Sequence, residues 1–369
     1  MHRDDAYYIG LALEEARKGE GRTSPNPAVG AIVVDGEGMI IGRGYHHKAG
    51  TPHAEVHALR DAGGRARGAS LYVTLEPCNH QGLTPPCTQA VLAAGVSTVV
   101  VGMPDPNPDV AGGGSQYLRS MGVQVRSGVL ETQCRELNLP FIKHSTTGLP
   151  WIIMKAGLSL DGRITFCPGE AGTVTGPQAS RYTHTVRNRV DAILVGVGTI
   201  LIDDPSLTTR LEGVEGTRDP LRVILDSSLR LPVTARVLRQ TSAAATWVCC
   251  GQSAQTDREK SLTRAGARVL RLPLDSAGRV ELVATLRLLA QANVTSVLVE
   301  GGATVHGAFL SQRHVDELLL LYAPIVIGDQ GTPLVRGYGV GERASALLPR
   351  RFSVQELGVD FLFRGFFRD

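Results

Sequence analysis

The pattern that most constrains the fold is a repeated alternation of short apolar strand segments with amphipathic helical segments. In the first half of the chain, apolar runs at residues 28–34, 39–45 and 70–75 alternate with helical segments at residues 53–63 and 87–95. Strands that are apolar throughout are buried on both faces, so helices must cover each side of the sheet that they form. The sequence therefore predicts a three-layer α/β/α domain in this half, in which the first two runs form a hairpin.

A second alternation of the same kind begins near residue 151. Its strand segments are residues 151–159, 191–196, 221–227, 245–251, 267–272, 296–300 and 317–327, with a helix at residues 280–293 among them. Between the two halves, the polar segment at residues 144–150 contains Gly and Pro and follows a helical segment that ends near residue 143. A chain of 369 residues is also too long for one ordinary core. We therefore predict two α/β domains, residues 1–146 and residues 147–369.

Composition and charge restrict the kinds of partner. The net charge is only +3 and no Lys/Arg-rich run supplies a basic patch, so a nucleic-acid partner is not expected. The longest apolar stretch, residues 318–327, is interrupted by Pro324 and is far shorter than the ~20 residues of a membrane-spanning helix. The N-terminal segment has an amphipathic helical pattern, with Ile9 and Leu13 on one face, and lacks the apolar centre of a signal peptide. We expect a cytoplasmic protein without a membrane partner.

The six cysteines are too few for a disulfide scaffold in a chain of this size, and a reducing compartment would keep them as thiols. Only Cys78 and Cys87 stand in a context that suggests chemistry. The others, which we expect to be buried and inert, are Cys134, Cys167, Cys249 and Cys250.

The strongest chemical pattern is formed by His53, Glu55, Cys78 and Cys87. One imidazole and two thiolates are good zinc ligands, and a site with three protein ligands leaves its fourth position to water. Zinc lowers the pKa of that water toward ~7, which provides a nucleophile at neutral pH. Glu55 stands two residues after His53, where it can take a proton from the water and give one to a leaving amine. This H-x-E…P-C arrangement is typical of zinc deaminases, so we expect one zinc ion per chain and Glu55 as the catalytic residue.

A closed structural zinc site is the alternative. Such a site needs a fourth ligand, which His57, four residues after His53 on a helix, or the nearby His80 could supply. A closed site leaves Glu55 and the second Pro-Cys element without a role. We therefore favour the open site and interpret His57 as a packed or solvent-edge histidine.

The spacing of the two cysteines narrows the substrate. Common nucleobase deaminases carry C-x-x-C, whereas eight residues separate Cys78 from Cys87 here. The motifs that accompany this loop are PNPAVG at residues 25–30, HAEVHAL at residues 53–59 and DPNP at residues 105–108. Together they resemble the deaminase half of the bifunctional deaminase/reductase family of riboflavin biosynthesis.

This resemblance implies a cytidine-deaminase-like fold and a set of substrate contacts. Asn26 would hold the pyrimidine, and Asp105 and Asn107 would line the substrate pocket. Without the resemblance, Asn26 would be interpreted as a turn residue between two prolines.

Leu83 departs from the family pattern, in which Lys or Arg is usual at this place. A cation in this loop suits a substrate that bears a ribose phosphate. The change bears on substrate binding and not on the zinc chemistry, unless Lys48 or Arg43 already holds the phosphate.

The resemblance continues from Trp151 almost to the C-terminus and implies a dihydrofolate-reductase-like domain that uses NADPH. The motifs that carry it are KAGLSLDGR at residues 155–163, VGVGT at 195–199, DDPSLTTR at 203–210 and VEGGAT at 299–304. Independently of any family, an apolar strand that enters Gly301-Gly302 and then a helix allows backbone N–H groups to approach a phosphate. A plain tight turn has the same pattern.

The same resemblance assigns residues to the two ligands of this domain. Those expected to contact NADPH are Gly157, Thr173, Thr199, Asp203, Ser227, Gly302, Ala303, Thr304, Val305, His306, Gly307 and Ala308. Those expected to face the ribosylaminopyrimidine are Ala171, Arg187, Leu207, Arg210 and Glu300. Guanidinium groups suit the phosphate of this substrate, although without the resemblance Arg187 and Arg210 would be interpreted as ordinary surface arginines. Asp203 and Glu300 are candidates for the proton donor.

The expected function is a two-step conversion in riboflavin biosynthesis. The first step is hydrolytic deamination of 2,5-diamino-6-(5-phosphoribosylamino)pyrimidin-4(3H)-one. The second is NADPH-dependent reduction of the ribosyl group of 5-amino-6-(5-phosphoribosylamino)uracil to ribityl, and we expect a homo-oligomer, a dimer or a tetramer. One alternative is a monofunctional reductase with a zinc-stabilised, weakly active deaminase-like domain. The other is a nucleic-acid-editing deaminase, which would need C-x-x-C and a basic or aromatic channel.

Overall fold

The computed structural model describes residues 4–82, 84–107 and 113–368. It divides into two compact units, Met1–Leu149 and Pro150–Asp369. The helix that we expected to end near residue 143 continues to Thr147, where Gly148 closes it with a left-handed φ of 66°. The division between the units consequently lies just beyond residue 146.

The N-terminal unit is built on a mixed sheet. Within the described residues its strands are β1 Gly30–Val34, β2 Ile40–Tyr45, β3 Ser70–Leu75, β4 Thr98–Met103 and β5 Gln124–Ser127. They lie in the order β2-β1-β3-β4-β5, with β1 antiparallel to both neighbours and β3, β4 and β5 parallel to one another. Every residue of β1 is buried, as is all of β3 and β4 beyond the first residue of each. The expected hairpin and the doubly covered sheet are both confirmed.

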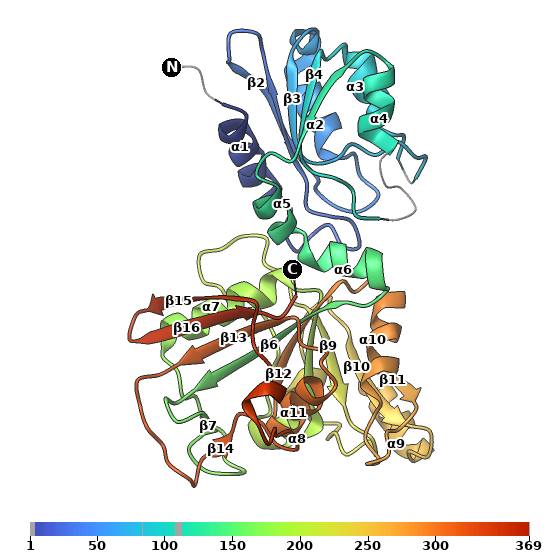
Figure 1. Ribbon diagram of the computed structural model, residues 1–369. Helices are drawn as coiled ribbons and strands as arrows, with labels where there is room; N and C mark the ends of the chain where they lie inside the picture. Colours follow the sequence, from blue (N-terminus) through green and yellow to red (C-terminus); the bar gives the residue numbers. More distant parts are fainter. Residues whose placement is uncertain (1–3, 83, 108–112, 369) are drawn as a thin grey trace. The chain divides into compact units, whose positions relative to one another are not determined.

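Helices pack on the two faces of this sheet (Figure 1). They are α1 Asp5–Arg17, α2 Ala54–Ala62, α3 Cys87–Ala94, α4 Gly113–Ser120 and α5 Glu131–Leu137, and α6 Leu139–Thr147 follows α5. α1 starts where the Asp4 carboxylate accepts a hydrogen bond from the Tyr7 N–H, and it buries Ile9 and Leu13 as the sequence predicts. α2 lies directly against β2 because Gly44 has no side chain to collide with the backbone of α2. This close packing brings the first turn of α2 to the edge of the sheet.

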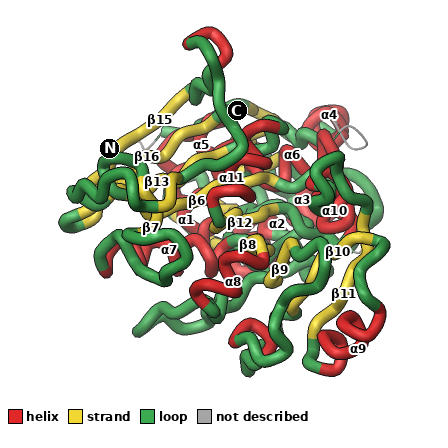
Figure 2. The backbone as a smooth tube through the Cα atoms, turned by 90° about the horizontal axis from the view of Figure 1, so that it is seen from below, coloured by secondary structure: helices red, strands yellow, loops and turns green. Residues whose placement is uncertain are grey.

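The C-terminal unit contains a larger and mostly parallel sheet. Its strands are β6 Trp151–Leu158, β8 Ala192–Gly196, β9 Leu221–Leu225, β10 Thr246–Gly251, β11 Ala267–Leu272, β12 Ser296–Gly301, β13 Glu317–Tyr322, β15 Arg351–Leu357 and β16 Asp360–Phe366. They lie in the order β11-β10-β9-β8-β12-β6-β13-β16-β15 (Figure 2). The strands from β11 to β13 are parallel, and the β16–β15 hairpin adds two antiparallel strands. A separate ribbon pairs β7 Arg163–Thr165 with β14 Thr332–Pro333.

Five described helices connect and cover the strands of this unit. They are α7 Pro177–Arg189, α8 Val197–Asp203, α9 Thr256–Arg264, α10 Leu282–Gln291 and α11 Ala303–Ser311. α11 begins directly after Gly302, as the sequence predicts, and packs against β12 and β8. No helix in the described part of the chain has the length and apolarity needed to cross a membrane.

Two expectations about this half need correction, and one element was not predicted. The strand predicted at residues 317–327 ends at Tyr322, because Pro324 has no N–H for a ladder hydrogen bond. The sequence analysis did not identify the C-terminal hairpin. Cys167, which we expected to be buried, is exposed after β7, whereas Cys134, Cys249 and Cys250 are buried as expected.

Candidate functional site

Three side chains converge at one edge of the N-terminal sheet. His53 is the N-cap residue of α2, Cys78 follows β3, and Cys87 is the first residue of α3. Their ligand atoms all lie within 4.8 Å of one another, with His53 Nδ1 at 3.2 Å from Cys87 Sγ and 3.5 Å from Cys78 Sγ. Among the described residues, no other His, Cys or carboxylate joins this group. One imidazole and two sulfurs at this separation fit a zinc ion and leave one coordination position open.

The thiols of Cys78 and Cys87 have pKa values that are shifted in opposite directions. Hydrogen bonds from the Cys87 thiol, the His53 ring and the Cys87 N–H (3.3 Å) outweigh burial and lower the pKa of Cys78 to about 4. The pKa of Cys87 is raised, because its thiol donates to Cys78 and is buried. These opposite shifts favour the thiolate at Cys78 and the thiol at Cys87, and binding of a metal ion releases protons from its ligands.

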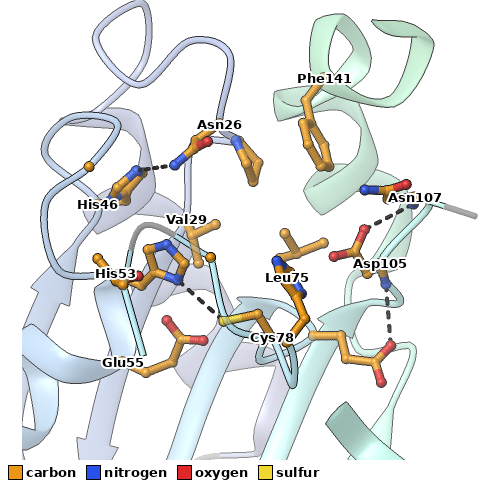
Figure 3. A pocket seen from close by; sticks show the side chains of 16 residues that line it. Asn26, Val29, His46, His53, Glu55, Leu75, Cys78, Asp105, Asn107 and Phe141 are labelled. Atoms are coloured by element: carbon orange, nitrogen blue, oxygen red, sulfur yellow. Dashed lines mark hydrogen bonds between the residues drawn. The ribbon is translucent and has the colours of Figure 1, made fainter. Parts of the chain in front are cut away.

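Glu55 lies beside this group but is not part of it. It is the second residue of α2, is buried, and turns its carboxyl into the same pocket as His53 and Cys78 (Figure 3). Burial raises the pKa of Glu55. The carboxylate therefore takes up a proton more easily than an exposed one, as a residue that transfers protons must.

His53, Cys78 and Glu55 line a cavity of about 280 Å³, whereas the buried Cys87 is not part of its lining. The residues that the sequence assigned to the pyrimidine substrate, Asn26, Asp105 and Asn107, all line it. Phe141 lies opposite Asn26 across the cavity (Figure 3). A volume near the lower end of the usual range for small-molecule sites fits a single heterocyclic ring.

Asn26 is held by His46, a residue that the sequence analysis did not single out. The Asn26 side-chain nitrogen lies 3.1 Å from His46 Nε2, and His46 Nδ1 lies 3.2 Å from the carbonyl oxygen of Pro52. Burial lowers the pKa of His46 to about 4, so the ring is neutral. A neutral ring that donates to Pro52 through Nδ1 must accept from the Asn26 amide at Nε2. The Asn26 carbonyl oxygen is therefore left to accept a hydrogen bond from a ligand.

Glu76 connects the turn after β3 to the turn after β4. Its carboxylate accepts hydrogen bonds from the N–H groups of Asp105 (3.3 Å) and Ser115 (2.7 Å). Gly114 permits the approach of α4, because any side chain there would collide with the Pro77 carbonyl. Glu76 thereby fixes Asp105 beside the zinc ligands, which explains a buried carboxylate that carries no chemistry of its own.

The candidates for a fourth zinc ligand lie outside the ligand group. The His57 ring stacks on His47 with ring centroids 4.3 Å apart, which agrees with a packed histidine. His80 lines the cavity but is not among the clustered ligand atoms. Leu83 lies outside the described residues, although its neighbours Gly82 and Thr84 line the cavity.

The C-terminal unit has a cavity of about 680 Å³ at the carboxyl ends of β8, β9 and β12. The expected NADPH residues that line it are Thr199, Asp203, Ser227, Gly302, Ala303, Thr304, Val305 and Ala308. Ligands of open α/β sheets bind at this edge of the strands. Burial raises the pKa of Asp203, so this carboxyl is the easier of the two candidate donors to protonate.

Four expected NADPH residues do not line this cavity. His306 and Gly307 lie on the buried side of α11, where His306 Nδ1 is 3.2 Å from the Leu334 carbonyl and a side chain at Gly307 would collide with the Arg336 carbonyl. Gly157 lies in β6 against Thr175, and Thr173 is exposed in the segment between β7 and α7. Residues 302–308 therefore do not all line the cavity. Successive side chains of a helix point to different faces, so only some of them can reach a ligand on one side.

Arg187 and Glu300 form a buried ion pair. Arg187 Nε and Nη2 each donate to a Glu300 carboxylate oxygen at 2.7 Å, and Nη1 donates to the Thr208 carbonyl at 3.0 Å. Burial would raise the pKa of Glu300, but Arg187 and Lys155, whose Nζ is 4.0 Å away, hold it at about 2. With its donors engaged in this way, Arg187 is not the free phosphate-binding group that we expected.

The other residues that we expected to face the substrate, Arg210, Leu207 and Ala171, differ in their exposure. Arg210 is exposed and donates its backbone N–H to His184 Nδ1 at 3.2 Å. Leu207 is buried, and Ala171 is exposed in the segment between β7 and α7. The sequence analysis did not name Lys155 or His184 as site residues, although Lys155 stands in the first reductase motif.

Comparisons with known proteins agree with both sites. Residues 2–103 match the family model of the cytidine and deoxycytidylate deaminase zinc-binding region, and residues 150–363 match that of the RibD C-terminal domain. Fold and sites together define a zinc-dependent deaminase joined to an NADPH-dependent reductase. The chain belongs to the RibD family of riboflavin biosynthesis proteins.

Several relatives match over nearly their whole length. The riboflavin biosynthesis protein RibD of Bacillus amyloliquefaciens is 43% identical over 91% of this chain and 89% of its own. That of Escherichia coli is 39% identical over 96% of this chain and 97% of its own. Among solved structures, RibD of Acinetobacter baumannii gives a TM-score of 0.87 at 36% identity, covering 98% of both chains. The structure described as a diaminohydroxyphosphoribosylaminopyrimidine deaminase/5-amino-6-(5-phosphoribosylamino)uracil reductase from Thermotoga maritima gives 0.84 at 35% identity, again over 98% of both chains.

Proposed function

We propose that this chain deaminates 2,5-diamino-6-(5-phosphoribosylamino)pyrimidin-4(3H)-one in its N-terminal unit and reduces the deaminated product in its C-terminal unit. The observation that carries the proposal is that His53 and Cys78 of the His53/Cys78/Cys87 group line one cavity together with Glu55 and Asn26. A purely structural zinc site would need a fourth protein ligand, and none of the described residues supplies one. A buried carboxyl at an open metal position has no structural purpose, so the monofunctional alternative does not account for Glu55.

In the deaminase step, His53, Cys78 and Cys87 would hold the zinc ion, which would supply an activated water as the nucleophile for the carbon that bears the amino group. Glu55 takes a proton from that water and returns one to the leaving amine, which departs as ammonia. The Asn26 carbonyl oxygen accepts a hydrogen bond from the pyrimidine, in an orientation fixed by His46. Asp105 and Asn107 bind the polar edge of the substrate.

In the reductase step, NADPH supplies a hydride to C1 of the open-chain ribose. The cavity at the carboxyl ends of β8, β9 and β12 would hold the cofactor, and the N-terminus of α11 offers backbone N–H groups that would suit its phosphates. Glu300 stays ionised and accepts hydrogen bonds from the substrate, while Arg187 and Lys155 keep it charged. Arg210 is exposed and remains the guanidinium that suits the substrate phosphate.

A direct test gives the purified, zinc-loaded protein the diaminopyrimidine substrate and follows ammonia first and NADPH oxidation second. We expect ammonia without NADPH, and NADPH oxidation only after ammonia has been released. Oxidation of NADPH without release of ammonia would overturn the proposed order.

We also propose that the chain forms a homo-oligomer through the β15–β16 hairpin. β15 is the last strand of its sheet, and its apolar residues Phe352 and Val354 are 66% and 58% exposed. An exposed apolar edge strand is prone to pair with another chain. Light scattering should give the mass of a dimer or tetramer for the wild type and a smaller mass for Phe352→Glu. A monomeric wild type would refute this assignment.

We place both activities in the cytoplasm. That compartment keeps Cys78 and Cys87 reduced for zinc and supplies NADPH. Fractionation of cells that express the chain should recover both activities with cytoplasmic markers.

A further inference from the structure

The NADPH cavity continues into a second, shallower hollow at the carboxyl ends of β9 and β10. This hollow, of about 580 Å³, is lined by the turn that follows β9 and the turn that follows β10, which are neighbouring parallel strands. Ser227, Ser228 and Arg230 line both spaces, so one ligand can extend from one into the other.

The position of Arg230 is set by the residues on either side of it. Leu229 and Leu231 are fully buried, and Leu229 has a left-handed backbone with φ 59°. Asp226 accepts a hydrogen bond from the Leu231 N–H at 2.8 Å, and Arg258 donates to the carbonyl oxygens of Leu229 (3.0 Å) and Leu231 (2.6 Å). With both neighbours pinned inward, the Arg230 side chain must project out of the turn.

Arg230 has no hydrogen-bond or ion-pair partner among the described residues, whereas Arg258 and Arg279, which also lie near the two spaces, are both engaged. The Arg258 guanidinium is engaged by the two leucine carbonyls, and Arg279 is paired with Asp275 at 3.0 Å. Arg336 also lines the NADPH cavity, but its backbone N–H donates to the Ala303 carbonyl, which places it beside α11. Arg230 is therefore the cation that is available at the β9–β10 end.

The order of the strands decides which part of the cofactor reaches this end. The buried Lys155, Arg187 and Glu300 group belongs to β6, α7 and the end of β12, so the reacting nicotinamide must lie near β12 and β6. In the sheet, β8 lies next to β12, and β9 and β10 follow in turn, so each of these strands lies farther from that group than the one before. The opposite end of an extended dinucleotide, its adenosine, thus falls at the turn of Ser227, Ser228 and Arg230.

We propose that Arg230, with Ser228 beside it, binds the 2′-phosphate of the NADPH adenosine and gives the reductase its preference for NADPH over NADH. This inference rests on the proposed reductase function and extends it to cofactor selection. The 2′-phosphate is the group that distinguishes the two cofactors, and an arginine near the adenosine ribose is a general way to accommodate it. A planar guanidinium suits a phosphate, and serine hydroxyls supply neutral donors. The carboxylates that line the NADPH cavity, such as Asp203 and Glu170, would repel a phosphate, which favours the Arg230 end.

The test measures equilibrium binding to the full, zinc-loaded chain by calorimetry, with NADPH and NADH as ligands. Adenosine 2′,5′-bisphosphate and 5′-AMP serve as fragments with and without the 2′-phosphate. For Arg230→Ala we expect the dissociation constant for NADPH to rise about 5- to 30-fold, the range between an exposed ion pair and a charge-assisted hydrogen bond. The dissociation constants for NADH and 5′-AMP should not change, which also shows that the variant is folded. Arg230→Lys should recover part of the loss.

A matched control is Arg287→Ala, which removes an exposed arginine of α10 that lines neither space. It should leave the affinities for all four ligands at their wild-type values. Equal loss of NADPH and NADH affinity in Arg230→Ala, or no loss of either, would overturn the inference. A wild-type chain that binds neither cofactor would instead contradict the proposed reductase function, so the two failures are distinguishable.

Discussion

Replacing Arg187 by Met should destabilise the C-terminal unit while leaving the deaminase intact. Arg187 donates two hydrogen bonds to Glu300 and one to Thr208, and the exposed fractions of the two charged side chains are 11% and 9%. Removal of one partner of a buried pair leaves an uncompensated charge, at a cost of about 3–5 kcal/mol. Lys155 at 4.0 Å from Glu300 offsets part of this cost. We therefore expect the free energy of unfolding to fall by about 2–4 kcal/mol at pH 7.

The assay is denaturant unfolding followed by tryptophan fluorescence. The chain has two tryptophans, Trp151 and Trp247, and both lie in the C-terminal unit, so the signal reports on that unit. The double variant Arg187→Met/Glu300→Gln should regain much of the loss, because the unpaired carboxylate is gone. Release of ammonia by the N-terminal unit serves as the internal control and should not change.

The pH dependence gives an independent check of the same pair. The pKa of Glu300 is lowered to about 2 from an ordinary value of 4.5. A lowered pKa contributes stability that is present above pH 4.5 and is lost as the pH falls toward 2, and a shift of this size corresponds to roughly 3 kcal/mol. The gap between wild type and Arg187→Met should therefore narrow as the pH falls from 5 toward 2. A variant as stable as the wild type at pH 7, or a gap that does not depend on pH, would refute the reasoning.

Three further outcomes are expected in the N-terminal unit. Elemental analysis should find about one zinc ion per chain in the wild type and a loss of zinc in Cys87→Ser. The control Cys134→Ser changes a buried thiol outside the site and should retain its zinc. Full zinc content in Cys87→Ser would exclude Cys87 as a ligand. His46→Phe should raise the deaminase KM more than it lowers kcat, because Asn26 loses the acceptor that orients it, and an unchanged KM would show that this orientation does not matter. Leu83→Lys should raise deaminase kcat/KM by about 5- to 100-fold by supplying a cation for the substrate phosphate, and no gain would indicate that another cation already binds that phosphate.

The sequence predicted the N-terminal unit well because its strands and helices are specified locally. The buried run of β1 and the helical spacing of Ile9 and Leu13 each indicate one structure. Short local motifs likewise identified His53, Glu55, Cys78 and Cys87, because H-x-E and the two Pro-Cys pairs are each recognisable within a few residues. The helix expected to end near residue 143 was misjudged because Thr146 and Thr147 continue it through hydrogen bonds of their hydroxyls to carbonyl oxygens one turn earlier.

Residues that act through partners distant in sequence were not predictable in this way. His46 is recognised only when the fold places it against Asn26, 20 positions earlier. Arg187 looked like a free phosphate ligand because Glu300, 113 positions later, pairs with it only in the folded sheet. The β15–β16 hairpin was missed because β15 is exposed on both faces, so its sequence lacks the alternation of a half-buried strand.

The measurement that tests the central claim most directly is the activity of Glu55→Gln in both steps. The variant removes the proton shuttle but none of the zinc ligands. We expect zinc content to remain at the wild-type level, ammonia release to fall by ~10²–10⁴-fold, and NADPH oxidation with the deaminated substrate to be unchanged. Deamination within a few-fold of the wild-type rate would contradict the role of Glu55, and with it the claim that this cavity is the deaminase active site.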